Sequence, residues 1–597
     1  MTLIDQAIAL HRQGNLVEAE ALYRKALDAD AGNFDALHML GIIRAQSGQY
    51  DEAEKLIGRA VSIDPTVVPC LHNYGTVFAK LKRYQDALNI YDRAVRLAPN
   101  YGPIYFDRGN ALYGLQRYDK ALASYTRAQS LMLGHKYLSG KLLHLKMLCC
   151  DWGQLDAVVE SIEKDLQERA APVEPFGYQA VANSARSFQR CVEIYTADKY
   201  PRSPAPLWRG EKYSHRKIRI GYVSGEFRAH VVCFLMAELF ELHDKNRFEL
   251  YAFDNGRDDG SDVRARINRA FDRVIEIGHL DDLQAASAIR KEEIDILVNL
   301  NGYFGDERTG VFSRKPAPVQ VNYLGFTATI GADYIDYIIA DAYVVPPQSR
   351  PFYTEKVVSL PDTYQANDTK RPLAALAPTR TQLGLPEAGF VFCCFCNTFK
   401  ITPQIFDVWM RLLQGVDGSV LWLLENHPVS SQNLRREAKQ RGIAPERLVF
   451  APSIKYADYL SRYRAADLFL DTFPFNGGAT ASDALWAGLP VLTCSGEPFT
   501  ARMAGSLLGA VDLPELITSS LADYEALALK LARDRALLAS IREKLARNRD
   551  TCPLFKSERF TRHLEAAYQT MWERSQRGEQ ATSFAVELLP QYSTRTR

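Results

Sequence analysis

Apolar and small residues between residue 4 and about residue 131 recur with a period of 34 positions, and the register does not drift. Such columns mark places where helices approach closely, and the period predicts antiparallel helix pairs. Glycines at 14 and 48 fall at the turns between helices. Three columns consist of small residues alone: Ala19, Ala53, Ala87 and Ala121; Ala26, Ala60, Ala94 and Ala128; and Gly41, Gly75 and Gly109.

The 34-residue period matches the tetratricopeptide pattern, so we expect residues 1–131 to form an α-helical tetratricopeptide superhelix. A plain helical bundle is the competing interpretation. Arrays of this kind use an extended concave surface to hold a peptide or a partner protein. Residues 132–211 continue as helix-rich sequence without the period, and we interpret them as a helical connector.

From Lys217 onward the pattern changes to short apolar runs that alternate with helical stretches, which predicts parallel sheets with crossover helices. The first set of expected strands comprises Ile218–Ser224, Glu249–Phe253, Val274–Ile277, Ile294–Leu300 and Tyr337–Ala340. The second comprises Phe390–Cys394, Val420–Leu424, Leu448–Phe450, Leu468–Leu470 and Val491–Thr493.

Two doubly wound sheets in tandem predict an α/β fold with two Rossmann-like lobes and a cleft at the carboxyl ends of the strands. We assign residues 212–375 to the N-terminal lobe and 376–575 to a C-terminal, nucleotide-sugar-binding lobe with a closing helix. A polar tail follows at 576–597. This is the GT-B architecture of nucleotide-sugar glycosyltransferases. Phosphorylases and some epimerases share it, so the fold alone does not give the function.

Composition restricts the location and the partners. The 597 residues carry a formal charge of +1, with 47% hydrophobic and 11% aromatic residues, as in a globular protein without a nucleic-acid partner. The N-terminal residues contain no secretory signal, and no apolar run is long enough to cross a membrane, so we expect a cytoplasmic protein. The ten cysteines include one CxxC pair, Cys393 and Cys396, without a second pair nearby. Reduced buried thiols are therefore favoured over a zinc site.

The segment from Phe475 to Gly488 reads as the end of a strand, a glycine turn and the start of a helix. Gly477 and Gly478 let the backbone turn closely, and Thr480 and Asp483 place polar groups at a helix N-terminus, which favours anions. We interpret this segment as a diphosphate site. An ordinary capped helix after a tight turn gives the same pattern.

Three further polar groups follow predicted strands. His230 lies in the loop after the first strand, and Asn301 follows another strand at the same edge, where its amide could bind a sugar or line a turn. Lys400 follows a strand of the second lobe and could neutralise charge on a departing phosphate. A structural histidine and a solvated lysine are the competing interpretations. No Asp-x-Asp pair ends a strand, so we expect no metal and no cofactor other than the nucleotide-sugar co-substrate.

Taken together, the chain resembles the O-linked N-acetylglucosaminyltransferases and their SPINDLY relatives, which are tetratricopeptide arrays fused to a two-lobed glycosyltransferase of family 41. The resemblance covers nearly the whole chain. Besides the repeats, its carriers are Cys150-Asp151-Trp152, Gly221 to His230, Leu297 to Tyr303, Pro316 to Gln320, Lys400, Val420 to Leu424, and Asn476 to Gly488.

The resemblance implies an enzyme: an inverting, metal-independent glycosyltransferase that moves a sugar, GlcNAc from UDP-GlcNAc, to a Ser or Thr hydroxyl of a protein. His230 matches the family's active-site histidine, which acts as a base or organises the reacting groups, and Lys400 matches the lysine on the donor diphosphate. The donor-binding positions are Asn397, Tyr459, Arg462, Gly477, Gly478, Ala479, Thr480 and Asp483, the last of which matches the acid that holds the ribose. Asn73 matches one rung of the family's peptide-gripping asparagine ladder.

Several positions depart from the family pattern. Gly478-Ala479-Thr480 replaces His-Thr-Thr at the phosphate turn, and Tyr459 replaces a histidine against the nucleobase. Residues 325–331 depart from the family's loop near the sugar, and Met39 and Asp107 replace rungs of the ladder. A flagellin or surface-protein glycosyltransferase that uses GDP-fucose or a CMP-linked nonulosonic acid is therefore one alternative. A non-catalytic repeat adapter is another.

Overall fold

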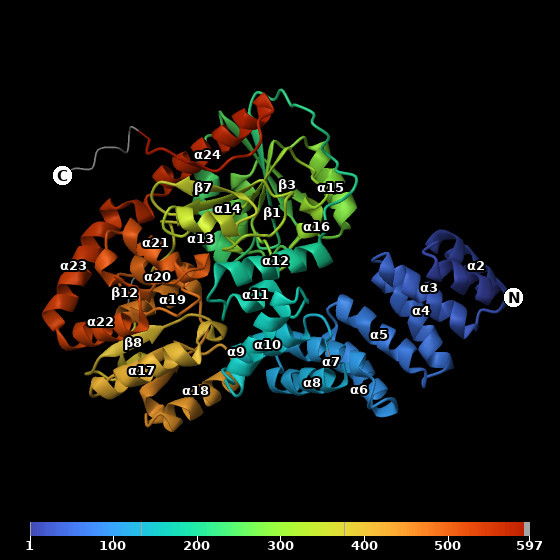
Figure 1. The fold of residues 1–597 in the computed structure, drawn as a ribbon, viewed down its shortest axis with the longest axis horizontal. Helices are drawn as coiled ribbons and strands as arrows, with labels where there is room; N and C mark the ends of the chain where they lie inside the picture. The colour runs from blue at the N-terminus through green and yellow to red at the C-terminus, as the bar shows by residue number, and fades with distance from the viewer. Residues whose placement is uncertain (1, 133, 375–376, 590–597) are drawn as a thin grey trace. The chain divides into compact units, whose positions relative to one another are not determined.

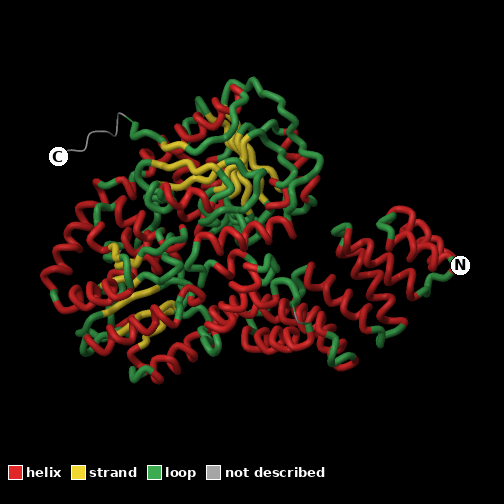
Figure 2. Tube along the Cα trace, in the orientation of Figure 1, coloured by secondary structure: helices red, strands yellow, loops and turns green. Residues whose placement is uncertain are grey.

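The structure, a computed structural model, describes residues 2–132, 134–374 and 377–589. The chain divides into two compact units, with the boundary between residues 145 and 146. Figure 1 shows the elements in chain order, and Figure 2 separates an all-helical first part from a second part that contains both sheets. The expected junction of the two lobes, at residues 375 and 376, lies outside the described residues.

The first unit consists of antiparallel helix pairs, which confirms the tetratricopeptide array. Its small-residue columns are close-packed: a Cβ built on Gly75 would lie 2.4 Å from the ring of Tyr91, and one on Gly109 would lie 2.5 Å from the ring of Tyr125. The helices are α1 (Leu3–Arg12), α2 (Leu16–Ala29), α3 (Phe34–Gln46), α4 (Tyr50–Ile63), α5 (Val68–Lys80), α6 (Tyr84–Leu97), α7 (Gly102–Gly114) and α8 (Tyr118–Leu131).

This packing makes a stability prediction. Gly75→Ala places a methyl group against the buried ring of Tyr91 and is expected to lower the free energy of unfolding of its repeat by about 1–3 kcal/mol, the usual result of overpacking. Hydrogen exchange of peptides covering α5 and α6 measures the change. Gly32→Ala is the matched control, because its nearest neighbour, the Asp30 carboxylate, is 3.4 Å away in ordinary contact. Equal exchange in both variants would contradict the packing argument.

Four helices occupy the expected connector: α9 (Leu138–Cys149), α10 (Leu155–Gln167), α11 (Pro175–Tyr178) and α12 (Ala185–Lys199). The end of α9 is fixed to the second lobe, because the carbonyl of Leu148 accepts a 2.8 Å hydrogen bond from Thr398. Trp152 packs against Phe406 with ring centroids 5.2 Å apart. Thus the Cys150-Asp151-Trp152 segment anchors the connector beneath the loop that carries Lys400.

The first lobe contains an all-parallel sheet of eight strands in the order β14-β7-β6-β5-β4-β1-β2-β3. The expected strands are all present, and the sequence prediction missed β5, β7 and β14. The strands are β1 (Ile218–Ser224), β2 (Phe248–Asp254), β3 (Arg273–Glu276), β4 (Ile296–Asn299), β5 (Val319–Asn322), β6 (Tyr337–Asp341), β7 (Lys356–Leu360) and β14 (Phe584–Ala585); the helices are α13 (Val231–Leu242), α14 (Asp262–Ala270), α15 (Asp282–Lys291) and α16 (Thr309–Phe312).

The second lobe contains a six-stranded parallel sheet in the order β10-β9-β8-β11-β12-β13. Two tandem doubly wound sheets therefore confirm the predicted fold class. The strands are β8 (Val391–Cys394), β9 (Val420–Leu424), β10 (Leu448–Ala451), β11 (Leu468–Leu470), β12 (Val491–Cys494) and β13 (Ile517–Thr518); the helices are α17 (Pro403–Gly415), α18 (Pro428–Gln440), α19 (Tyr456–Arg462), α20 (Ala479–Trp486), α21 (Met503–Ala510), α22 (Leu521–Arg533) and α23 (Arg535–Thr551).

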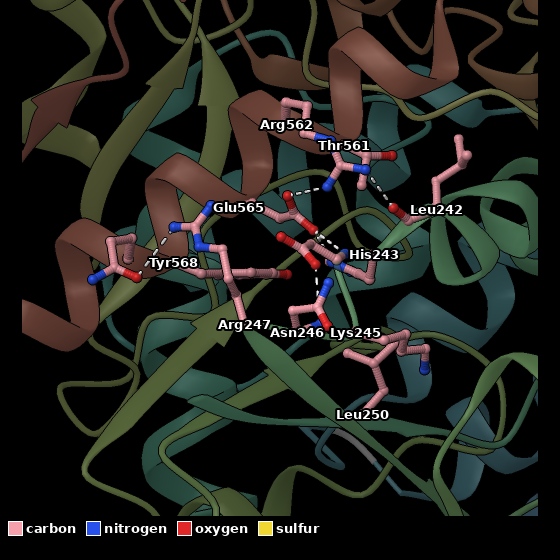
Figure 3. A network of polar contacts seen from close by, with 12 residues as sticks. Leu242, His243, Lys245, Asn246, Arg247, Leu250, Thr561, Arg562, Glu565 and Tyr568 are labelled. Atoms are coloured by element: carbon pink, nitrogen blue, oxygen red, sulfur yellow. Dashed lines mark hydrogen bonds and ion pairs between the residues drawn. The ribbon is translucent and has the colours of Figure 1, made fainter. Parts of the chain in front are cut away.

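The closing helix α24 (Ser557–Arg577) returns to the first lobe, where Leu564 and Tyr568 join the buried core of the first sheet. Figure 3 shows the polar network that fixes it. Glu565 accepts hydrogen bonds from the backbone N–H of Asp244, at 2.7 Å, and contacts Nδ1 of the fully buried His243 at 3.1 Å. The expected polar tail, 576–597, begins in the last turn of this helix, and its residues 584–585 extend the sheet as β14.

Candidate active site

Each sheet reverses its strand order at one point, and this places the predicted site loops. In the first sheet the reversal lies between β1 and β4, and in the second between β8 and β11. Ligands of doubly wound folds bind at such switch points, outside the carboxyl ends of the strands. His230 follows β1, Lys400 follows β8, and the glycine turn at 477–478 follows β11. The structure therefore places these groups in switch-point loops.

His230 is the N-cap of α13, with a side chain 23% exposed. Its Nδ1 accepts a long hydrogen bond, 3.4 Å, from the backbone N–H of Val232 and lies 3.8 Å from the Glu226 carboxylate. Its ring stacks on Phe304, with centroids 5.6 Å apart. Burial lowers the pKa of His230 below its ordinary value, against the opposing charge of Glu226. The imidazole is therefore neutral at pH 7.

The asparagine that ends β4, Asn299, and Asn301 just after the strand line a turn. The Oδ1 atom of Asn299 accepts from the backbone N–H groups of Asn301 and Gly302, at 3.1 and 2.9 Å. Asn301 in turn accepts from the N–H of Gly225 at 3.1 Å and donates to the carbonyl of Phe304 at 2.9 Å. Both side chains are buried. Of the two functions considered for Asn301, this geometry favours holding the loop before His230 in place.

Lys400 points at the turn predicted to bind phosphate, residues 477–480, which we call the phosphate turn. Its Nζ donates a 2.9 Å hydrogen bond to the carbonyl of Asn476 and lies 3.7 Å from the ring centroid of Phe475. Burial lowers the pKa of Lys400 below its ordinary value, while Cys396 and Asp471 oppose the shift. The ammonium is thus held in a partly dry site, where a charge acts strongly on a nearby phosphate.

The phosphate turn is organised from beneath by Asp471. Its carboxylate accepts from the N–H of Gly477 at 2.6 Å and from the hydroxyl of Thr493 at 2.7 Å. A Cβ on Gly477 would lie 2.6 Å from the hydroxyl of Thr480, so any other residue there would force the Thr480 side chain to move. Helix α20 then begins after Gly478 without a side-chain cap, which leaves its first N–H groups for an anion.

Cys396 lies beside the phosphate turn, a position that the sequence did not predict. Its Sγ lies 3.3 Å from the hydroxyl of Thr480. A hydrogen bond from Cys394 lowers the pKa of the Cys396 thiol, and the nearby Lys400 acts in the same direction. The CxxC spacing had drawn attention to a possible metal ligand, whereas the structure places this thiol beside the helix start.

Asp483, on the first turns of α20, is held by two groups from elsewhere in the chain. Its Oδ1 accepts from Nη1 of Arg371 at 2.8 Å and from the hydroxyl of Tyr456 at 2.9 Å. The Asp483 and Arg371 side chains are 7% and 1% exposed. Burial raises the pKa of Asp483 to about 6, against the opposing charge of Arg371. Neither partner was recognised from the sequence, because both contacts join distant segments.

The remaining predicted donor positions are Tyr459, Arg462 and Asn397, and each has local contacts of its own. Tyr459 contacts Tyr463 through their hydroxyls at 2.6 Å. The guanidinium of Arg462 lies over the rings of Phe395 and Tyr459, at 4.3 and 4.9 Å, and is fully buried. Asn397 is exposed and caps the turn that carries Lys400, with its Oδ1 3.3 Å from the N–H of Phe399.

One aromatic residue joins the two switch-point loops. Phe176, on α11, contacts Phe304 and Phe399, with ring centroids 5.3 and 5.6 Å apart. Phe304 stacks on His230, and Phe399 adjoins Lys400 in sequence and contacts Phe475 at 5.9 Å. The structure therefore brings the His230 and Lys400 loops together through the connector, a contact that no sequence pattern indicates.

Asn73 lies in the first unit, on α5. Its Nδ2 contacts Nε2 of the buried His38 at 3.0 Å. One repeat later the equivalent pair consists of His72 and Asp107, with Nε2 and Oδ2 2.7 Å apart. The rungs at Asn73 and Asp107 are therefore part of a histidine-linked polar row along the first helices of successive repeats.

Across residues 2–132, 134–374 and 377–589, no three His, Cys, Asp or Glu side chains gather as metal ligands. Within the same described segments, no helix combines the length and the apolar character that a membrane span requires.

A tetratricopeptide array followed by two doubly wound sheets, with a lysine and an uncapped helix start at the second switch point, defines a repeat protein with a GT-B glycosyltransferase fold. The family model for glycosyl transferase family 41 matches residues 179–377 and 365–564. Two tetratricopeptide-repeat models match residues 10–69 and 73–131. The chain belongs to glycosyl transferase family 41.

Three known proteins illustrate the similarity. The probable UDP-N-acetylglucosamine–peptide N-acetylglucosaminyltransferase SEC of Arabidopsis thaliana is 34% identical over 466 residues, 74% of this chain and 48% of that protein. The UDP-N-acetylglucosamine–peptide N-acetylglucosaminyltransferase of Caenorhabditis elegans is 25% identical over 559 residues, 72% of this chain and 48% of that protein. The chain thus spans about half the length of these curated relatives.

Among solved structures, a mutant of the Thermobaculum terrenum O-GlcNAc transferase superposes with a TM-score of 0.68 and 28% identity. The match covers 92% of this chain and 99% of that one.

Proposed function

We propose that this chain is a protein O-glycosyltransferase that transfers GlcNAc from UDP-GlcNAc to Ser or Thr hydroxyls of a protein acceptor, with inversion and without a metal. The acceptor oxygen attacks the anomeric carbon as the bond from that carbon to the diphosphate oxygen breaks. The names of the Arabidopsis thaliana and Caenorhabditis elegans relatives support the donor and the peptide acceptor.

The observation that carries the proposal is the pairing of Lys400 with the open start of α20. The Lys400 ammonium is bonded to the carbonyl of Asn476, immediately before Gly477. The N–H groups after Gly478 have no side-chain cap. A fixed cation and backbone N–H donors in a partly dry site can stabilise the negative charge that builds up on a leaving diphosphate. The diphosphate charge then requires no metal ion.

His230 is suited to act in its neutral form on the acceptor hydroxyl rather than on the leaving diphosphate. The Val232 N–H directed at Nδ1 favours the tautomer with its proton on Nε2. In that tautomer Nε2 donates a hydrogen bond and orients the acceptor hydroxyl or the donor, and the hydroxyl proton passes to water. In the other tautomer Nε2 takes this proton itself. We propose the first role.

The repeats present the protein acceptor, and the row around Asn73 and Asp107 selects it. Loss of the amide at position 107 changes which backbone groups this face can bind, because a carboxylate only accepts hydrogen bonds.

All ten cysteines are free thiols, which fits a reducing compartment such as the cytoplasm.

Calorimetric titration of the purified chain with UDP, GDP, CMP and their sugar conjugates tests the proposal, together with transfer of labelled GlcNAc to Ser- and Thr-containing peptides. We expect UDP and UDP-GlcNAc to bind and label to appear on the peptides. Binding of CMP instead of UDP would refute the GlcNAc assignment and favour a nonulosonic acid donor. Binding of no nucleotide would leave the repeat-adapter function.

A further inference from the structure

An aromatic stack connects the two lobes next to the candidate site. Phe234 lies on α13 of the first lobe, and Tyr456 begins α19 of the second. Their ring centroids are 4.1 Å apart and their planes differ by 7°. Such a close parallel contact between helices of the two lobes favours one arrangement of these helices over others.

Each partner of the stack also connects to a candidate site residue. Phe234 lies one helical turn after His230, and its backbone N–H donates to the carbonyl of His230 at 2.9 Å. Tyr456 donates its hydroxyl to Oδ1 of Asp483 at 2.9 Å, alongside Arg371 at 2.8 Å.

The second carboxylate oxygen of Asp483 is left for a ligand. Within the part of the chain that the structure describes, no protein group donates to Oδ2. This oxygen is nevertheless not fully buried. The hydroxyl of Tyr456 and the guanidinium of Arg371 therefore orient the carboxylate by one oxygen and leave the other for a ribose hydroxyl.

We propose that the Phe234–Tyr456 stack is an interlobe positioning pair: Tyr456 orients Asp483 for the donor ribose, and Phe234 sets the position of His230 relative to the bound donor. This inference rests on the proposed function. Neither residue touches the reacting atoms, and each acts through the site residue beside it. A misplacement of about 1 Å at a reacting centre reduces rates about 100-fold, so a loosened stack has a measurable effect.

The two partners are expected to affect different kinetic constants. Tyr456→Phe keeps the ring and loses the hydroxyl, so the Kd of UDP and the donor KM rise about tenfold while kcat changes less than threefold. Phe234→Ala leaves Asp483 oriented, so kcat falls at least tenfold with little change in the Kd of UDP. Phe234→Tyr restores the ring and is expected to restore kcat. Tyr251→Phe, on β2, is the matched control for loss of a tyrosine hydroxyl.

A pH profile separates orientation from simple packing. Asp483 is faced by Arg371, Tyr456, Tyr459 and Tyr463, and burial raises its pKa to about 6. The carboxylate, which accepts the ribose hydroxyl, prevails above that pH, so UDP affinity falls as the pH drops below about 6. The Tyr456 hydrogen bond opposes the rise of the pKa. Its removal in Tyr456→Phe is expected to move the loss of affinity to higher pH.

Hydrogen exchange of the ligand-free full-length chain tests the stack without any donor. We expect Phe234→Ala to accelerate exchange at the start of α13 and in α19, and Phe234→Tyr to restore protection. Unchanged exchange, or equal effects of Phe234→Ala and Tyr456→Phe on KM and kcat, would overturn the positioning pair. Failure of the wild-type chain to bind any nucleotide would instead overturn the proposed function, whatever the exchange shows.

Discussion

Replacing Lys400 by alanine is expected to lower kcat at least about 100-fold, the usual loss when a preorganised charge is removed from a developing anion. The ammonium is already aimed at the turn, because it donates to the carbonyl of Asn476 at 2.9 Å. It therefore acts on the diphosphate without rearrangement. The donor KM is expected to change less than kcat, because the backbone N–H groups of α20 still bind the phosphates. Steady-state kinetics with UDP-GlcNAc and a peptide acceptor measure both constants.

Two variants keep this prediction interpretable. Lys400→Met retains an unbranched apolar stem against Phe475, so a rate equal to that of Lys400→Ala in a folded protein assigns the loss to the charge. Lys439→Ala, on an exposed position of α18, is the matched control and is expected to leave the rate unchanged. Turnover within threefold of wild type in Lys400→Met would remove Lys400 from the proposed mechanism.

The same lysine predicts an alkaline limit of activity. Burial lowers the pKa of Lys400 below that of an exposed lysine. The charged form, which we propose stabilises the leaving group, is therefore the form present below this lowered pKa. It is lost as the pH rises through the lowered pKa. The rate is expected to fall on the alkaline side at a lower pH than an ordinary lysine would give, and Lys400→Met is expected to lack this limb.

The large-scale fold could be predicted because its signals are local. The repeat period depends on small residues that recur every 34 positions, and the contacts of Gly75 and Gly109 with tyrosine rings show why. Most strands are apolar runs flanked by turns. Strands β5 and β7 were missed as strands because they lie in segments where prolines and polar turns break the alternation. The two-residue strand β14 exists only because β7 is there to pair with it.

The loops that carry the candidate site could be predicted from the sequence, but the residues that hold these loops in place could not. His230, Lys400 and the Gly477 turn directly follow strands, so strand order alone brings them to the switch points. Arg371 and Tyr456 reach Asp483 over 112 and 27 positions, respectively, and such contacts follow from packing of the finished lobes. Phe176 is likewise an ordinary aromatic residue of the connector until the fold places it between two site loops.

Replacing His230 by alanine is expected to lower kcat about 100-fold or more, with the Kd of UDP within about threefold of wild type. The imidazole lies at the N-terminus of α13, in the other lobe from Lys400, so its loss leaves the diphosphate contacts intact. Calorimetry with UDP and single-turnover transfer of labelled GlcNAc measure the two effects separately. His279→Ala, at an exposed position of the same lobe, is the matched control.

The choice between the two roles of His230 follows from a second substitution and a pH profile. His230→Gln supplies an N–H donor but no base, so partial recovery of kcat over His230→Ala is expected if the imidazole positions the hydroxyl. Because burial lowers the pKa of His230, the neutral form prevails from pH 6.5 upward, and protonation is expected to reduce the rate only below that pH. No recovery in His230→Gln, together with an acid limb that disappears in both variants, would assign His230 as the base.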